Sequence, residues 1–158
     1  MRRIQIVDLD GCIADDRWRR KYIMPDVPDL DHIERFGKYH QSSILDFALN
    51  LNEITEPHVV VLTGRPLLYH EITLMWLREN AYIEPLYMIM RNNNDHSPSP
   101  VLKKRMVHGL LDWNSYGIAR EEIVSAIDDR AAIVDMYQRD FGINARVVRI
   151  GEEEHVNG

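Results

Sequence analysis

The strongest constraint on the fold of this 158-residue chain is a series of five short apolar runs separated by helical patterns. The runs are rich in valine, isoleucine, leucine and methionine, and they cover residues 3–9, 58–63, 86–90, 123–127 and 146–150. Nearly continuous apolar runs of this length are typical of strands buried on both faces. Strands alternating with helices therefore predict an α/β fold, with a parallel sheet and helices on both faces.

Three of the intervals between these runs show helical patterns with one apolar face. We expect one helix to have Pro66 in its first turn, and a second to begin with Ser99 as N-cap and Pro100 in the first turn. A third is expected over residues 129–141, ending at Gly142. The apolar stripes comprise Leu68, Ile72, Met75 and Trp76; Val101, Met106 and Leu110; and Ile133, Met136 and Tyr137.

The interval between Gly11 and Thr63 contains 51 residues, far more than a simple crossover requires. A crossover between parallel strands needs only about 10–15 residues. The excess predicts one domain over 1–158 with a small cap insertion at about 13–57, placed over the end of the first strand. A stripe of Ile44, Leu45, Ala48 and Leu51 predicts a helix inside the insertion.

Composition restricts the classes of partner. The net charge of −6 provides no overall field for nucleic acid or anionic lipid, although the basic segment 17–21 can still contact a phosphate chain. No apolar run reaches the roughly 18 residues of a membrane span, and the apolar part of the N-terminus is too short for a signal peptide. The single cysteine, Cys12, suits a reducing compartment. We therefore expect a cytoplasmic protein without a membrane partner.

Polar residues gather where the expected strands end, which is where open α/β sheets bind ligands. A lysine pair also begins the helix that follows the third strand, where positive charge opposes the helix dipole. Each group alone has an ordinary explanation as a cap, a turn or a solvated face, but their joint occurrence favours function. The groups are Asp8-Leu9-Asp10-Gly11, Thr63-Gly64-Arg65, Lys103-Lys104 and Asp128-Asp129.

Several carboxylates in one crevice repel one another unless a cation lies among them. Hard oxygen ligands without a cluster of His or Cys favour Mg²⁺ over zinc. Two aspartates separated by one residue suit phosphoryl transfer, because one attacks phosphorus while the other handles the proton of the leaving oxygen. Thr63 and the Gly64 amide are then expected to bind phosphate oxygens, and a lysine to neutralise the remaining charge.

These four groups, in this order, resemble the motifs of the haloacid dehalogenase-like (HAD) superfamily. The resemblance covers residues 4–143 and implies a Rossmann-like core with a small cap, Mg²⁺ and an aspartyl-phosphate intermediate. It implies that Asp8 is nucleophile and metal ligand, and that Asp10 is the general acid/base with its backbone carbonyl on the metal. Asp128 and Asp129 complete the metal site, directly or through water.

Within the superfamily the chain is most similar to the phosphatase half of bacteriophage polynucleotide kinases, which removes 3′-phosphates from nucleic-acid ends. This resemblance selects Lys103 rather than Lys104, and it implies that Arg19 and Arg65 bind phosphate or substrate. It also implies the cytoplasm of a bacterium or of a phage-infected cell. The chain departs from the pattern at Ser99, where the family has an acidic residue, and it contains no kinase P-loop (G-x-x-x-x-G-K-S/T).

The expected substrate is a phosphorylated nucleotide or a nucleic-acid 3′ end, and no obligate protein partner is evident. An alternative is a phosphatase for nucleoside or deoxynucleoside monophosphates, in which the insertion encloses the small substrate. Four aromatic residues are candidates for base stacking: Trp18, Tyr22, Tyr39 and Trp113. More remote alternatives are a phosphorylation-switched receiver module, disfavoured because the third strand lacks a terminal aspartate, and a non-catalytic binding protein with this fold.

Overall fold

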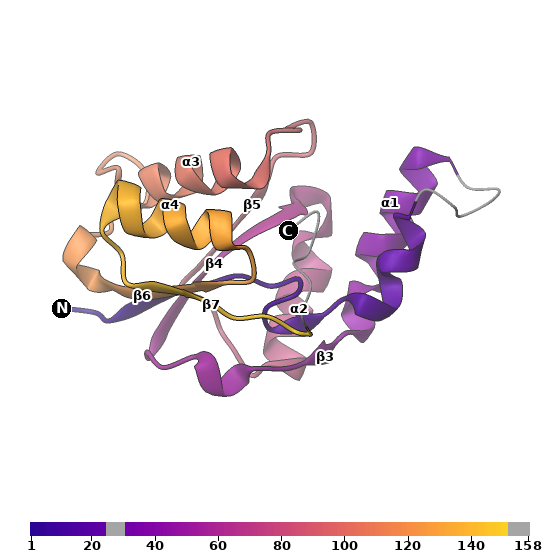
Figure 1. Cartoon of the computed structure of the whole chain (residues 1–158), viewed down its shortest axis with the longest axis horizontal. Helices are drawn as coiled ribbons and strands as arrows, with labels where there is room; N and C mark the ends of the chain where they lie inside the picture. Colours follow the sequence, from indigo (N-terminus) through magenta and orange to yellow (C-terminus); the bar gives the residue numbers. More distant parts are fainter. Residues whose placement is uncertain (25–30, 152–158) are drawn as a thin grey trace.

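The computed structural model describes residues 1–24 and 31–151 and contains a five-stranded sheet at its centre (Figure 1). All neighbouring strands in this sheet are parallel, in the order β5-β4-β1-β6-β7. The strands are β1 (Ile4–Val7), β4 (His58–Pro66), β5 (Tyr87–Arg91), β6 (Ile123–Asp128) and β7 (Ala145–Val147). The predicted α/β class is confirmed, and each strand overlaps one of the five apolar runs, although β7 ends at Val147 and not at the predicted residue 150.

Helices cover both faces of the sheet: α3 (Ser99–Leu111) and α4 (Ala131–Phe141) lie on one face and α2 (His70–Asn80) on the other (Figure 1). Side chains alternate between the two faces along each strand. On β1, Ile4 and Ile6 pack in the cluster of α3 and α4, whereas Val7 packs in the cluster of α2. Burial on both faces explains why the strands are apolar without alternation.

The helix that was predicted to have Pro66 in its first turn corresponds to α2, and its predicted start is wrong. Strand β4 continues through Pro66, a 3-10 turn η4 (Leu67–Tyr69) follows, and α2 begins at His70. Proline fixes φ but not ψ, and here its ψ of 147° keeps the chain extended. Leu68, which was expected in the buried stripe, lies before the helix and is 72% exposed.

Helix α3 begins at Ser99, with Pro98 rather than Ser99 at the N-cap position. Val101 was expected on its apolar face but is half exposed, because the buried face instead runs through Leu102 and Lys103. Helix α4 begins two residues later than predicted, and its predicted apolar face is buried. Gly142 ends it in the left-handed conformation, with its backbone N–H donating to the Gln138 carbonyl.

The segment after β1 contains the short antiparallel strands β2 (Ala14–Asp15) and β3 (Phe47–Ala48). Between them lies α1 (His32–Gln41), which projects to the side of the main sheet in Figure 1. The helix predicted around residues 44–51 is absent from this described region, where Asn50 adopts a positive φ of 57° that interrupts a helix. The other short elements are the 3-10 helices η1 (Arg17–Tyr22), η2 (Ser42–Leu45), η3 (Leu51–Glu53) and η5 (Arg120–Glu122).

Helix α1 was not predicted from the sequence, because few of its residues are apolar. Its N-cap is Asp31, whose carboxylate accepts a hydrogen bond from the Glu34 backbone N–H at 2.8 Å. None of the helices in the described part of the chain has the length and apolar character needed to cross a bilayer.

Candidate active site

The register of the central strands brings two aspartates together at the carboxyl edge of the sheet. Val7 of β1 pairs with Ile127 of β6, so Asp8 and Asp128 follow at the same level. The Asp8 backbone N–H also donates to the Ile127 carbonyl at 3.2 Å. Asp129 is the next residue along, and carboxylate oxygens of the three aspartates lie within 4.8 Å of one another. All three residues are buried.

Lys103 reaches this cluster from the buried face of α3. Its Nζ lies 2.7 Å from Asp8 Oδ1 and 2.5 Å from Asp128 Oδ2. Burial alone lowers the pKa of Lys103, but the negative charges of Asp128 and Asp8 outweigh it and hold the pKa well above its usual range. Lys104 instead lies on the surface, 3.3 Å from Asp140. The structure therefore places Lys103, and not its neighbour, among the aspartates.

The cluster carries more negative than positive charge. Burial, followed by the charge of Asp8, raises the pKa of Asp128 to about 6, although Lys103 opposes this shift. Within the described residues, Asp8 Oδ2 is buried and accepts no hydrogen bond. A buried carboxylate oxygen without a donor is costly unless a cation or a substrate group approaches it. The donor set of three carboxylates fits a hard divalent cation such as Mg²⁺.

Asp10 lies two residues after Asp8 and is held by two buried arginines. Its Oδ1 accepts hydrogen bonds from Arg19 Nη2 and from Arg65 Nη2, both at 2.6 Å. Arg65 Nε adds a contact of 3.1 Å to Asp10 Oδ2. These bonds fix the orientation of the Asp10 carboxylate from two different segments, η1 and β4.

Asp46, which the sequence patterns did not single out, completes this arrangement. Its carboxylate accepts hydrogen bonds from Arg19 Nε at 2.9 Å and from Arg19 Nη2 at 2.7 Å, and it lies 3.7 Å from Arg65 Nη2. Burial raises the pKa of Asp46, while Arg19 opposes the rise. The guanidinium of Arg19 also lies 4.2 Å from the centre of the Tyr39 ring. The carboxyl groups of Asp10 and Asp46 and the two guanidinium groups thus form one buried, hydrogen-bonded cluster.

The sequence predicted that Arg19 and Arg65 bind phosphate or substrate. In the structure every guanidinium nitrogen of both residues donates to a protein group, including the Tyr39 carbonyl for Arg19 and the Thr73 hydroxyl for Arg65. These contacts hold Asp10, and direct binding of phosphate by the two arginines stays a prediction.

Thr63 and Gly64 lie at the end of β4, where the pairing with β5 shifts register between Thr63 and Pro66. The Thr63 hydroxyl accepts a hydrogen bond from the Arg65 backbone N–H at 3.1 Å, and the Gly64 carbonyl accepts one from Arg91 Nε at 3.0 Å. Gly64 and Pro66 of this irregular segment line the cavity described next.

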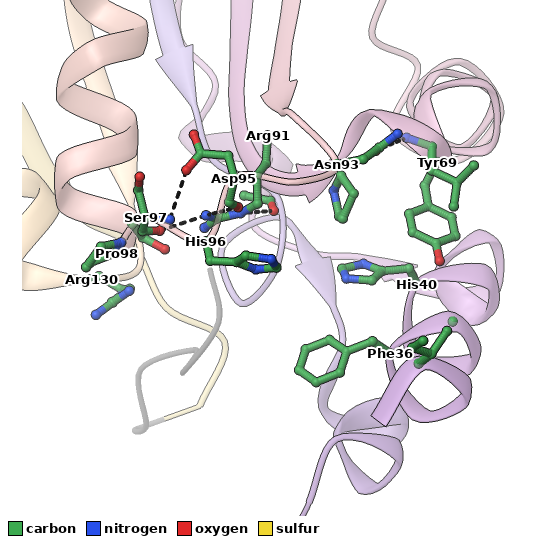
Figure 2. Close-up of a pocket in the computed structure, with 16 residues that line it drawn as sticks. Phe36, His40, Tyr69, Arg91, Asn93, Asp95, His96, Ser97, Pro98 and Arg130 are labelled. Atoms are coloured by element: carbon green, nitrogen blue, oxygen red, sulfur yellow. Dashed lines mark hydrogen bonds between the residues drawn. The ribbon is translucent and has the colours of Figure 1, made fainter. Parts of the chain in front are cut away.

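A cavity of about 670 Å³ is lined by chain neighbours of the site residues, since Gly64 follows Thr63 and Arg130 follows Asp129 (Figure 2). Gly64, Ser99 and Arg130 line it from the core, and helix α1 and the loop 92–98 line its other walls. Arg91 fixes that loop, since its Nη1 donates to the carbonyls of Asp95 at 3.1 Å and Ser97 at 2.7 Å. The lining of the cavity comes from separate segments, so no local pattern in the sequence could have revealed it.

The four aromatic residues predicted for base stacking do not line this cavity, and base stacking by them stays a prediction. Tyr39 is buried against Arg19, Trp18 donates its indole N–H to Asp46, and Trp113 is exposed elsewhere. The rings that do line the cavity belong to Phe36, His40, Tyr69 and His96.

Cys12 is also buried close to the aspartates. Burial, and then the negative charge of Asp8, raises the pKa of its thiol well above the usual range. An uncharged thiol is a poor nucleophile, which is consistent with a packing role.

Comparison with protein families shows the family to which the chain belongs. Residues 2–152 match the family model of the polynucleotide kinase PNKP phosphatase domain. The chain belongs to this family. It is therefore a HAD-type phosphatase, as the motifs predicted. Family membership favours an enzyme over the receiver module, and β5 indeed ends in Met90 and Arg91 without an aspartate. Among curated proteins, a sequence search finds no match.

Solved structures agree with the fold of a PNKP phosphatase domain. A chain of the Pnkp1/Rnl/Hen1 RNA repair complex superposes with a TM-score of 0.66 at 20% identity, over 97% of this chain and 44% of that chain. A second structure of the Pnkp1/Rnl/Hen1 complex gives a TM-score of 0.67 at 21% identity, over 97% and 47%. The chain thus spans less than half the length of these two relatives.

A third similar structure is CbbY from Rhodobacter sphaeroides in complex with phosphate. It superposes with a TM-score of 0.60 at 12% identity and covers 100% of this chain and 92% of that chain. At such low identity these likenesses show the shared fold.

Proposed function

We propose that this phosphatase hydrolyses the 3′-phosphate of nucleic-acid ends or nucleotides through an aspartyl-phosphate on Asp8. The observation that carries the proposal is the environment of Asp8: one oxygen is bound by Lys103 and the other is buried without a hydrogen-bond partner. A carboxylate held in this way has one oxygen oriented and one oxygen available for reaction or for a metal ion.

In the first step an Asp8 oxygen attacks phosphorus, and the bond from phosphorus to the leaving oxygen breaks. Asp10 gives its proton to that oxygen, so the product leaves as an alcohol. In the second step a water molecule attacks the phosphoaspartate and Asp10 takes its proton. The bond between phosphorus and Asp8 then breaks, inorganic phosphate is released, and both aspartates return to their starting states.

The surrounding groups support this sequence of steps. Lys103 neutralises charge beside Asp8, and we assign the Thr63 hydroxyl and the Gly64 amide to phosphate oxygens. Mg²⁺ is the proposed cofactor, held by Asp8, the Asp10 backbone carbonyl, Asp128 and Asp129. When bound, it supplies positive charge that offsets the carboxylates and the phosphoryl oxygens.

The substrate class rests on the family and on the adjoining cavity. The matched family model is that of a polynucleotide kinase phosphatase domain, and the neighbouring Pnkp1 chain belongs to an RNA repair complex. A free nucleoside monophosphate is the second candidate. It is favoured by the volume of about 670 Å³, which lies in the usual range for small-molecule sites, and by α1 lining one wall.

One assay separates these substrates: phosphate release with Mg²⁺ from a 3′-phosphorylated oligonucleotide and from a panel of 3′- and 5′-nucleoside monophosphates. Preference for the oligonucleotide supports a nucleic-acid end-repair enzyme. Preference for monomers supports a nucleotide phosphatase and assigns the insertion to enclosing the substrate. Absence of phosphate release from every substrate rejects the proposed function.

The mechanism is tested with Asp8→Asn and Asp10→Asn. Quenching the wild-type reaction with acid should trap labelled phosphate on the protein, and Asp8→Asn should lose both this label and turnover. Asp10→Asn should be crippled in turnover while retaining the ability to bind phosphate. Retained turnover in Asp8→Asn would remove the proposed nucleophile.

A further inference from the structure

One wall of the cavity consists of aromatic rings that the phosphate chemistry does not use. The His40 and Tyr69 rings are stacked, with centroids 4.9 Å apart and planes inclined by 25°. The Phe36 ring lies 6.4 Å from His40, at an angle of 34°. Figure 2 shows these three side chains together, with His96 directed toward them from the loop 92–98. Phe36 and His40 come from α1 and Tyr69 from η4, so the wall joins the insertion to the core.

The position of this aromatic wall (Phe36, His40 and Tyr69) relative to the aspartates determines the direction in which a bound substrate extends from Asp8. Gly64, which follows Thr63, and Arg130, which follows Asp129, line the same cavity, and Figure 2 shows Arg130 on the side away from the three rings. A substrate whose phosphate reaches Asp8 therefore extends the rest of its structure into the cavity and toward the rings.

Two polar side chains that line the cavity from the loop 92–98, those of Asn93 and Asp95, are engaged in contacts within the protein. Asp95 pairs with Arg105 at 2.8 Å, and the Asn93 side-chain oxygen accepts from the Leu68 backbone N–H at 2.9 Å. A sugar without a base is recognised mainly through hydrogen bonds, whereas flat rings recognise another flat ring by stacking. The wall is suited to a planar aromatic group.

We propose that the aromatic wall stacks the base of the nucleotide whose phosphate is hydrolysed, with Tyr69 as a specificity-determining residue. This inference rests on the proposed function, because phosphate transfer at Asp8 sets the end of the cavity that the base occupies. Stacking uses the π-face that every base has, so the enzyme requires a base at this position but discriminates little among the four.

The test combines a change in the protein with a change in the substrate. Two 3′-phosphorylated oligonucleotides are compared, one with a normal 3′-terminal nucleotide and one with an abasic residue there. Tyr69→Leu removes the ring, Tyr69→Phe retains it, and Trp113→Leu removes an exposed aromatic side chain outside the cavity. Thermal unfolding checks that each variant is folded.

In the wild type, the abasic substrate should have a lower kcat/KM by about tenfold or more. Tyr69→Leu should cause a similar loss with the normal substrate and little further loss with the abasic one, whereas Tyr69→Phe and Trp113→Leu should resemble the wild type. Equal losses on both substrates in Tyr69→Leu, or a wild type indifferent to the missing base, overturn the stacking site while leaving the phosphatase intact. Failure of the wild type on both substrates instead rejects nucleic-acid ends as the substrate, and the inference with them.

Discussion

Lys103 shows how a single buried charge can serve both stability and chemistry. Its ammonium group is fully buried between Asp8 and Asp128, and the pKa of the amine is held well above its usual range by these carboxylates against the effect of burial. Buried ion pairs need not stabilise a fold relative to apolar residues, but removing one partner leaves an uncompensated charge. The conformation of the site therefore depends on this side chain.

Lys103→Met should destabilise the metal-free protein by roughly 3–5 kcal/mol, because two carboxylates lose their buried counter-charge. Turnover should fall by about 100-fold or more, since the charge beside the attacked phosphate is lost. Chemical denaturation in EDTA measures the first effect and steady-state kinetics the second. Lys104→Met is the matched control, and its exposed position predicts a change within about 0.5 kcal/mol. Comparable effects of the two substitutions would contradict this account.

Asp46 acts on the site indirectly, through Arg19 and Arg65. We expect Asp46→Ala to destabilise the protein by roughly 3–5 kcal/mol and to lower kcat, because Arg19 loses a buried carboxylate and its hold on Asp10 loosens. Asp15→Ala breaks a more exposed pair with Arg17 in the same insertion and should cost only about 0–1 kcal/mol. Denaturation midpoints and kcat are measured for both variants. Equal losses of stability and of kcat in Asp46→Ala and Asp15→Ala would show that the buried cluster has no special role.

At the scale of elements, helices α3 and α4 each contain or end at a glycine, and the two glycines differ in backbone conformation. Helix α4 ends at Gly142 with a φ of 62°, and the chain then turns into β7. Helix α3 carries Lys103 in its second turn and contains Gly109 near its end, where an added Cβ would meet nothing within 4 Å. Gly142 therefore has a left-handed backbone that disfavours a side chain, whereas Gly109 has a helical backbone with room for one.

Gly142→Ala should lower the free energy of unfolding by about 1 kcal/mol, because an L-residue is strained at this positive φ. Gly109→Ala should raise it by about 0.5–1 kcal/mol, because alanine is the better helix former and has room. Neither residue touches the aspartates, so kcat should be unchanged in both. Thermal or chemical unfolding with parallel activity assays checks the prediction, which fails if the two shifts have the same sign.

At the scale of the whole molecule, the carboxyl edge of the sheet concentrates negative charge that the fold alone does not balance. Asp8, Asp128 and Asp129 come from the ends of two neighbouring strands, and Lys103 binds the carboxylates of Asp8 and Asp128. A divalent cation that binds only the folded protein should stabilise it by linkage. Metal content and global stability are therefore coupled.

EDTA should abolish activity and lower the midpoint of thermal unfolding, and Mg²⁺ should restore both. Saturation at about 100 times the dissociation constant corresponds to about 2.7 kcal/mol of added stability. In Asp129→Asn the stabilisation by Mg²⁺ should be smaller, which ties the effect to this cluster rather than to ionic strength. Activity that survives thorough removal of metal would count against the site.

The fold class and the segments that supply the chemistry follow from the amino-acid sequence alone. Continuous apolar runs report burial on both faces, and the carboxyl ends of parallel strands must share one edge. For this reason the sequence patterns predict Asp8, Asp128 and Asp129 together, and folding brings them together with Lys103. Local boundaries are less well determined, as Pro66 shows, because its fixed φ suits the end of a strand as well as the start of a helix.

The surroundings of this centre depend on tertiary contacts that local patterns do not contain. The contacts between Arg19 and Asp46 and between Arg65 and Asp10 join residues 27 and 55 positions apart, and no periodicity in the sequence records such distances. Helix α1 has few apolar residues, and its role in the cavity depends on where β2 and β3 hold it. Local patterns predict which strands are buried, whereas the partners that folding brings together depend on the path of the whole chain.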